Sequence, residues 1–265
     1  MKKTIKYSLI IGTYLVLVYY FPLIFIPFFL IGLYDVLRNK AINFSIIKQY
    51  YLGNGMLTWL ASPINLFLDI ISLPFINKGV YKLQDLPESH QSEIKSLLET
   101  VKSENLIEKV AKYTEGLPRA MFFFKWYGKN MECPIEIPAF QKDFRFIRTV
   151  GISAFNVRES TTRHFGPFRP SFRVLYCIND EQDDNVYIHV GNVKHRWKEE
   201  KLFIFDDTLL HQSFNESDHP RFCLFVDILR PSYLSFINDF AVSLIRIGLQ
   251  SVKGIFYKKW KVIEN

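Results

Sequence analysis

The sequence has few cysteines, and their positions exclude two common kinds of structural cross-link. Only Cys133, Cys177 and Cys223 are present, far apart and odd in number. Such spacing offers neither a disulfide framework nor the paired cysteines of a zinc site, and it is typical of a reducing compartment. Internal repeats and low-complexity tracts are also lacking, so the length of 265 residues indicates one substantial core with appendages.

Charge is missing from a long stretch near the N-terminus. No residue between Tyr7 and Tyr34 is charged, and about 20 apolar residues suffice to cross a bilayer as a helix. The stretch lacks the small-residue cleavage site of a signal peptide, so we expect residues 1–40 to form a retained membrane anchor with a transmembrane segment. Pro22 and Pro27 would kink it. A single kinked span is favoured over a re-entrant helix pair, and the nearly balanced flanking charges give only a weak indication of orientation.

Two other segments have apolar patterns that are compatible with a membrane surface. Residues 41–82 contain the run MLTWLASPINLFLDIISLPF, which predicts an interfacial segment or, alternatively, a helix buried in the domain. Residues 234–265 have apolar side chains at helical spacing and a basic end, which predicts an amphipathic helix. Packing on the domain and contact with a membrane surface remain alternatives for this helix.

The net charge of +7 favours an anionic partner, either nucleic acid or the cytoplasmic leaflet of a membrane. The apolar segments decide between the two. We therefore expect membrane association and a membrane lipid as partner, and no nucleic acid.

The middle of the chain, residues 83–233, changes from helical to β patterning. Residues 88–115 alternate acidic and basic side chains around a stripe that includes Ile94 and Leu97, which predicts a helix with His90 on its solvent face. Short runs rich in β-branched and aromatic residues follow, separated by turn sequences. Without helices between them, such strands predict a mainly β fold, an antiparallel sandwich or jelly roll. The predicted strands are 120–127, 147–157, 172–178, 185–190, 201–205, 210–214 and 221–229.

Two of the six histidines differ from the rest in their position. His164 and His211 each lie at the edge of a predicted strand, next to a turn. A jelly roll brings distant strand edges together at its mouth, where two imidazoles can bind one divalent iron. The familiar iron triad adds a carboxylate two residues after the first histidine, where this sequence has Gly166. Spacing alone therefore leaves two interpretations open, a metal site and a pair of structural histidines.

The stretches HFGP, residues 164–167, and VGNVKHRWKEEKLFIFDDTLLHQSFNESDHPRFCLFVDILRP, residues 190–231, resemble the aspartyl/asparaginyl β-hydroxylase family. The family pattern is W-x-E-G-x-x-x-x-F-D-[DE]-[ST]-x-x-H, and Glu200 stands in place of its glycine. The resemblance covers roughly residues 119–231. It implies a double-stranded β-helix, the jelly-roll fold of oxygenases that use Fe(II), 2-oxoglutarate and O2. The matching residues are Trp197, Glu199, Phe205, Asp206, Asp207, Thr208 and His211.

The resemblance also implies roles for five residues. His164 and His211 would bind the iron, and Arg221 would bind the far carboxylate of 2-oxoglutarate, with Ser153 as a hydroxyl donor. Arginine suits this task because its planar guanidinium pairs with a carboxylate through two hydrogen bonds. Arg173 would meet a second anionic group, on the cosubstrate or on the substrate. His164, His211 and Arg221 are thus the expected catalytic residues.

Gly166 separates this chain from the bacterial branch of the family that it otherwise resembles. Animal peptide hydroxylases of the family also have Gly there, whereas the bacterial lipid A hydroxylases have Asp. Water, or help from Asp206 or Asp207, would take the place of the third ligand. The segment FFFKWYGKNMECP, residues 122–134, resembles the K-W-Y-G segment of the lipid A hydroxylases, which also begin with a hydrophobic anchor.

These features together predict a membrane-anchored Fe(II)/2-oxoglutarate-dependent dioxygenase that hydroxylates a lipid acyl chain. The favoured target is the 2-position of a lipid A fatty acid, with the catalytic domain at the cytoplasmic face of a bacterial inner membrane. One alternative is the same chemistry on an ornithine lipid or on an Asp or Asn side chain of a protein. The other is a membrane-tethered binding protein without turnover.

Overall fold

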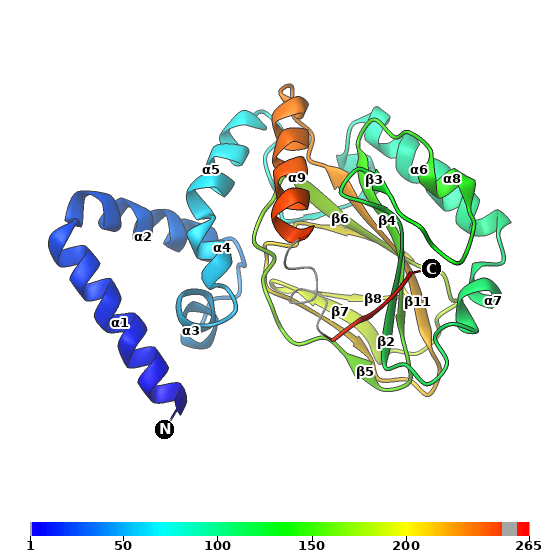
Figure 1. Ribbon diagram of the computed structural model, residues 1–265, viewed down its shortest axis with the longest axis horizontal. Helices are drawn as coiled ribbons and strands as arrows, with labels where there is room; N and C mark the ends of the chain where they lie inside the picture. The colour runs from blue at the N-terminus through cyan, green and yellow to red at the C-terminus, as the bar shows by residue number, and fades with distance from the viewer. Residues whose placement is uncertain (1, 251–258, 265) are drawn as a thin grey trace.

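Two β-sheets form the centre of the molecule, and helices lie at both ends of them (Figure 1). The structure, a computed structural model, describes residues 2–250 and 259–264. Its strands are β1 (Val80–Tyr81), β2 (Arg119–Trp126), β3 (Lys129–Asn130), β4 (Ile147–Phe155), β5 (Glu159–Ser160), β6 (Ser171–Cys177), β7 (Val186–Val190), β8 (Val193–Arg196), β9 (Leu202–Phe205), β10 (His211–Asn215), β11 (Arg221–Leu229) and β12 (Lys261–Ile263).

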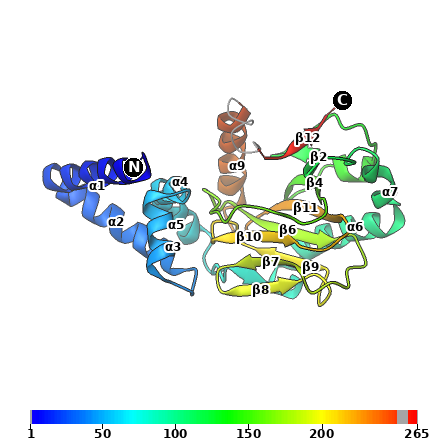
Figure 2. The same cartoon turned by 90° about the horizontal axis from the view of Figure 1, so that it is seen from below.

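The helices surround the sheets in two groups. Figure 2 shows α1 to α5 on one side of the sheets and α6 and α7 on the other. The helices are α1 (Lys2–Tyr20), α2 (Pro22–Leu37), α3 (Phe44–Leu52), α4 (Met56–Leu60), α5 (Ser62–Ile71), the 3-10 helix η1 (Leu83–Asp85), α6 (Glu88–Ser103), α7 (Leu106–Ala111), α8 (Pro138–Gln141) and α9 (Ser235–Gln250).

The strand order is that of a jelly roll. The larger sheet runs β1-β9-β6-β11-β4-β2-β12, with β3 beside β2, and the smaller sheet runs β5-β10-β7-β8. From β4 to β11 the chain passes back and forth between the sheets, and the pairs that these strands form are antiparallel. The mainly β, jelly-roll prediction is confirmed, and every predicted strand is present. The sheet begins before residue 83, because β1 pairs with β9.

Alternate residues of β11 pack into two different hydrophobic cores. Phe222, Leu224 and Val226 face the main core, which α6 and α7 cover on one side of the larger sheet. Cys223 faces a smaller core that includes residues of both sheets and therefore lies between them. The predicted helix over residues 88–115 is present as α6 and α7, but His90 is buried against Phe146 and does not face solvent. Its neighbours in the stripe, Ile94, Leu97 and Val101, pack into the main core as predicted.

The apolar run near the N-terminus forms two helices instead of the single span expected. The break falls at Phe21, whose ψ of 52° is not helical. Pro22 explains the break, since a proline disfavours the helical conformation of the residue before it, whereas Pro27 stays inside α2. Within residues 2–250 and 259–264, no helix combines the length and apolarity that a bilayer span needs. The predicted transmembrane segment is therefore corrected to the helix pair α1–α2, which makes a sharp bend in Figure 1.

Helix α5 reconciles the two alternatives for residues 41–82. Asn65 and Leu68 are buried, and Asn65 bonds to the backbone of Pro167 and Arg169 before β6, while Ile64, Phe67 and Ile70 are exposed. The segment is thus a helical layer with one face on the domain and an apolar face left open. Helix α9 has the same character, with Phe236, Phe240, Leu244 and Ile247 exposed.

The end of the chain departs from the predicted C-terminal helix. Helix α9 ends at Gln250, and the expected helical residues 251–258 lie outside the described residues. Lys261–Ile263 form β12, which pairs in parallel with β2. The physical reason is that β2 would otherwise expose an unpaired edge, and a strand placed there satisfies its backbone groups. Trp260 packs edge-on against Phe155.

Buried ion pairs join the N-terminal helices to the β-domain. Arg169 and Arg230 are each 1% exposed, and both pair with Asp69 of α5. Arg169 also pairs with Asp35 of α2. Because one unpaired buried charge costs several kcal/mol, these contacts fix the helices to the domain in one arrangement.

Asp206 forms the second part of this junction. It is 0% exposed, and its carboxylate accepts hydrogen bonds from Arg38 at 2.7 Å and Asn77 at 2.6 Å. Thr208 donates to it through its backbone N–H and its hydroxyl. Burial alone would raise the pKa of Asp206, but Arg38 and Arg169 outweigh burial and hold the pKa well below its usual range.

We expect Asp206→Ala to lower the free energy of unfolding by about 3–5 kcal/mol, because it removes a fully buried carboxylate and leaves the largely buried Arg38 with only its longer contact to Asp35 at 3.6 Å. Since the folded-state pKa is depressed, the contribution of Asp206 is complete above the unfolded pKa of about 3.9 and is lost as pH falls below it. Urea unfolding at pH 7 and near pH 3 measures both effects. Asp218→Ala, whose exposed pair with Arg158 is worth at most about 1 kcal/mol, is the control. An equal loss in the two variants would contradict the expectation.

Candidate metal and anion site

The backbone brings His164 and His211 together. His164 N–H donates to the carbonyl of His211 at 3.0 Å, and His211 N–H donates to the carbonyl of His164 at 2.9 Å. This antiparallel bridge places the two imidazole ring centroids 4.2 Å apart. The structure thus joins the two histidines that the sequence singled out.

Both imidazoles are held in the same way. His211 Nδ1 lies 2.8 Å from the carbonyl oxygen of Leu209, and His164 Nδ1 lies 2.6 Å from that of Thr162. A carbonyl oxygen only accepts hydrogen bonds, so each Nδ1 must carry the proton and each Nε2 keeps a free lone pair. In both cases the carbonyl belongs to the residue two positions earlier, so one local geometry serves both rings.

The charge state of the pair suits metal binding. Burial lowers the pKa of His211 well below its usual value, and the neighbouring His164 lowers it further. Burial also lowers the pKa of His164. Both rings are therefore neutral at pH 7, and two neutral Nε2 atoms form the donor set that divalent iron accepts. The residues fit the metal that the sequence predicted, although no group of three possible ligands occurs among the described residues.

Arg221 is a buried cation without a carboxylate partner in the described part of the chain. It is 1% exposed, and its Nη1 donates to the hydroxyl of Ser213 at 3.0 Å. Its guanidinium lies 4.0 Å from the ring centroid of Phe155, and its Nε has no acceptor within the described residues. Arg169 and Arg230 are buried to the same extent, but both have carboxylate partners. An anion is the missing partner that this geometry fits.

The guanidinium of Arg221 and His211 both lie between the two sheets, on the inward faces of β11 and β10. His211 and Ser213 are both buried on the same face of β10, about 7 Å apart along the strand. Because Arg221 contacts Ser213, a short dicarboxylate can reach from the imidazoles to the guanidinium. Sequence reasoning missed Ser213, yet its position two residues after His211 on a strand could have indicated it.

Ser153 lies beside Arg221, and Arg173 lies farther along the same sheet. Ser153 is 3% exposed and stands opposite Cys223, two residues from Arg221 on β11. Arg173 is already paired with Asp227 at 2.7 Å and with Asp207 at 3.2 Å. The hydroxyl of Ser153 donates to the carbonyl of Cys223 at 3.4 Å, and Arg173 contacts two carboxylates of the protein itself.

Asp207 occupies the space that a side chain at position 166 would need. A Cβ built on Gly166 would lie 2.7 Å from a carboxylate oxygen of Asp207 and 2.8 Å from its backbone oxygen. Gly166 N–H also donates to that backbone oxygen at 2.8 Å. Burial raises the pKa of Asp207 to about 7, although Arg173 opposes the rise. The glycine therefore leaves room for the carboxylate of Asp207.

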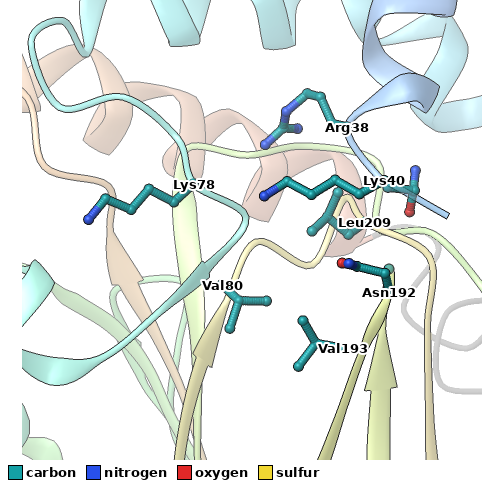
Figure 3. A pocket seen from close by; sticks show the side chains of 9 residues that line it. Arg38, Lys40, Lys78, Val80, Asn192, Val193 and Leu209 are labelled. Carbon is teal, nitrogen blue, oxygen red and sulfur yellow. The ribbon is translucent and has the colours of Figure 1, made fainter.

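A pocket of about 380 Å³ lies behind the loop that carries His211. In Figure 3, Val80, Val193 and Leu209 line its apolar part, and the side chains of Arg38 and Lys40 extend above them. The cations do not converge on one point, since Arg38 binds Asp206 and Lys78 binds Asp85. The pocket thus adjoins the histidine loop without containing either histidine.

The fold and the site define a jelly-roll protein with a histidine pair beside a buried arginine. Residues 88–231 match the aspartyl/asparaginyl beta-hydroxylase family. Since the match covers more than half of the chain, the chain belongs to this family, as the sequence resemblance predicted.

One relative is an ornithine lipid ester-linked acyl 2-hydroxylase of Rhizobium tropici, 34% identical over 154 residues. The match covers 53% of this chain and 53% of the relative, so the chain spans about half the length of the relative it matches.

Solved structures give a much weaker likeness. An oxidoreductase of the 2OG-Fe(II) oxygenase family from Burkholderia pseudomallei has 12% identity and a TM-score of 0.30, over 49% of this chain and 80% of that one. A cupin domain from Bordetella pertussis has 14% identity and a TM-score of 0.25, over 38% and 96%. Likeness at this level does not bear on activity.

We expect His211→Ala to lower the affinity of the metal-free protein for Co²⁺, a spectroscopic substitute for Fe(II), by at least about 100-fold. The reason is that one of the two Nε2 donors disappears. Titration followed by Co²⁺ absorption measures the loss. His189→Ala is the matched control, because His189 lies on the neighbouring strand β7 but is exposed on the outer face. Comparable losses in the two variants would count against the site.

Proposed function

We propose that the chain is an Fe(II)- and 2-oxoglutarate-dependent oxygenase that hydroxylates an acyl chain of a membrane lipid. The observation that carries the proposal is the buried Arg221, which has no carboxylate partner among the described residues and contacts Ser213, two residues from His211 on β10. Family membership supports the reaction type. The name of the Rhizobium tropici relative supports an acyl chain as the target.

The residues of the chain prepare the site for this reaction. His164 and His211 would hold the iron, which supplies the redox chemistry that activates O2 when bound. Arg221 and Ser213, with Ser153 nearby, bind and neutralise the far carboxylate of 2-oxoglutarate. The rings of Phe155 and Trp197 lie against the guanidinium of Arg221 and exclude water from it, which strengthens its pairing with an anion.

The third side of the metal site belongs to Asp207 in this proposal. Arg173 holds the carboxylate of Asp207 against Gly166, and Asp227 fixes Arg173 from its other side. Asp207 would thus be the carboxylate available on this side of the site to accept a hydrogen bond. This arrangement accounts for a glycine at position 166, where a side chain would collide with Asp207.

Two candidate substrates, lipid A and an ornithine lipid, differ in their headgroup. Lipid A is favoured by the resemblance of residues 122–134 to the lipid A hydroxylases, and an ornithine lipid is favoured by the relative's name. Both candidates require the same chemistry at an acyl carbon. We include both lipids in the proposal and let product analysis decide.

Membrane association is part of the proposal, and its support is the exposed apolar surface of the helices. Leu9, Leu15 and Leu23 are 67%, 67% and 90% exposed, and α5 and α9 add further apolar faces. These two helices lie side by side in both views (Figures 1 and 2), and Ser232 bonds to the carbonyl of Ile71 between them. Apolar patches of this extent mark sites of contact with protein or membrane. With a net charge of +7, the cytoplasmic face of a bacterial inner membrane is the proposed location.

We expect Arg221→Met to raise the 2-oxoglutarate concentration needed for half-maximal succinate release by about 30-fold or more. A lost charge-assisted pair in a buried site costs at least about 2 kcal/mol. The comparison variant is Arg158→Met, which removes an exposed arginine and should leave the requirement unchanged. An unaltered requirement in Arg221→Met would refute its role.

Expression of the gene in a bacterium that makes both lipid A and ornithine lipids tests the substrate. Mass spectrometry of the extracted lipids is expected to show one added oxygen on an acyl chain of one of the two lipids. The His211→Ala variant should produce no such addition. A protein that releases succinate but modifies neither lipid would redirect the proposal to a protein side chain.

A further inference from the structure

One peptide unit links the end of α2 to a candidate metal ligand. The carbonyl of Leu209 accepts the hydrogen bond from His211 Nδ1 at 2.8 Å, and the N–H of Leu210 donates to Asn39 Oδ1 at 2.7 Å. This carbonyl and this N–H belong to the same peptide group. Because a peptide group is planar and rigid, fixing its N–H also fixes the direction of its carbonyl. Asn39 thereby sets the orientation of the carbonyl that holds the imidazole.

Asn39 is itself firmly held. Its side chain is 2% exposed, and its Nδ2 donates to the carbonyl of Val36 at 2.9 Å in the last turn of α2. The adjacent residue, Arg38, binds Asp206 in the same loop. The side-chain oxygen of Asn39 therefore has one available direction, toward Leu210.

We propose that Asn39 is a positioning residue for the metal ligand His211, acting through the Leu209–Leu210 peptide. The inference rests on the proposed function, since it assigns His211 to a metal. Asn39 lies outside residues 88–231, which match the family. The N-terminal helices are thus an integral part of the metal centre in this chain.

A second set of contacts supports the same role for these helices at the other histidine. The carbonyl of Arg163 accepts hydrogen bonds from Asn54 at 2.7 Å and Gln49 at 2.9 Å. That carbonyl shares a peptide group with the N–H of His164, which donates to His211. Thr58 donates to the carbonyl of Gly166 at 2.9 Å. Both turns that carry a histidine are therefore held by side chains of residues 39–58.

Substitution of Asn39 is expected to lower the metal affinity, which a loss of stability elsewhere in the fold would not do. Without the acceptor of Asn39, the N–H of the Leu209–Leu210 peptide loses its hydrogen bond, so the direction of the Leu209 carbonyl is less well fixed and the Nδ1–H tautomer of His211 is less well supported. Partners that orient a metal-binding histidine contribute about 10–100-fold to metal affinity. Asn39→Leu, which removes the acceptor with little change in volume, is expected to lower the affinity for Co²⁺ by that factor.

Two further variants make the comparison specific. Asn238→Leu also removes a buried asparagine, one that bonds to the carbonyl of Arg230, and is expected to keep the affinity within about threefold of the unaltered protein. If Asn39→Leu fails to fold, Asn39→Ser, which is too short to reach Leu210, replaces it. Equal losses in the Asn39 and Asn238 variants would overturn the proposal.

A measurement without metal separates this proposal from the proposed function. In the full-length, metal-free protein labelled with ¹⁵N-histidine, long-range ¹H–¹⁵N correlation spectra report which ring nitrogen carries the proton. The unaltered protein is expected to show the Nδ1–H tautomer at His211, and Asn39→Leu a mixture of both tautomers. An unchanged tautomer refutes the role of Asn39. If the unaltered protein binds no Co²⁺, the metal assignment fails, while the tautomer result still decides the role of Asn39.

Discussion

The candidate site depends on the two backbone hydrogen bonds that His164 and His211 exchange. They fix the spacing of the imidazoles before any metal arrives, and the carbonyl groups of Thr162 and Leu209 then set the rotation of each ring. Pre-orientation of this kind lowers the entropy that binding would otherwise cost. The bridge also places His211 at the start of β10, so that Ser213, and through it Arg221, lies at a fixed distance. The site is therefore an outcome of strand register more than of side-chain packing.

Strands with a clear residue pattern could be predicted from the sequence. The runs of aromatic and β-branched residues correspond to β2, β4, β6, β7, β9, β10 and β11 within about two residues. Strands β1, β3 and β5 have only two residues each, too few for any periodicity, and β12 exists only because β2 offers it an edge. The single N-terminal span was wrong because Pro22 was expected only to kink the helix, whereas Phe21 before it leaves the helical conformation and the run divides into two helices.

The residues of the site could be predicted where they belong to a sequence motif. His164, His211, Arg221 and Ser153 follow from the family pattern, and the structure brings them to one interior. Asn39 has no such pattern, because its role requires the end of α2 to reach a loop far along the chain. The crowding of Asp207 against Gly166 likewise depends on tertiary contact. Sequence motifs thus identify the candidate binding groups, and the fold supplies the groups that orient them.

The order of synthesis gives the buried ion pairs an additional consequence. Asp35 and Asp69 leave the ribosome early, but Arg169 and Arg230, their partners, are made much later. At about 5–20 residues per second, the ribosome needs on the order of 10–50 seconds to reach residue 230. Throughout that interval the apolar helices α1 to α5 have no finished domain to dock on. A lipid bilayer or a chaperone near the exit tunnel would shield them, and cell-free translation with and without vesicles would differ in the yield of folded protein.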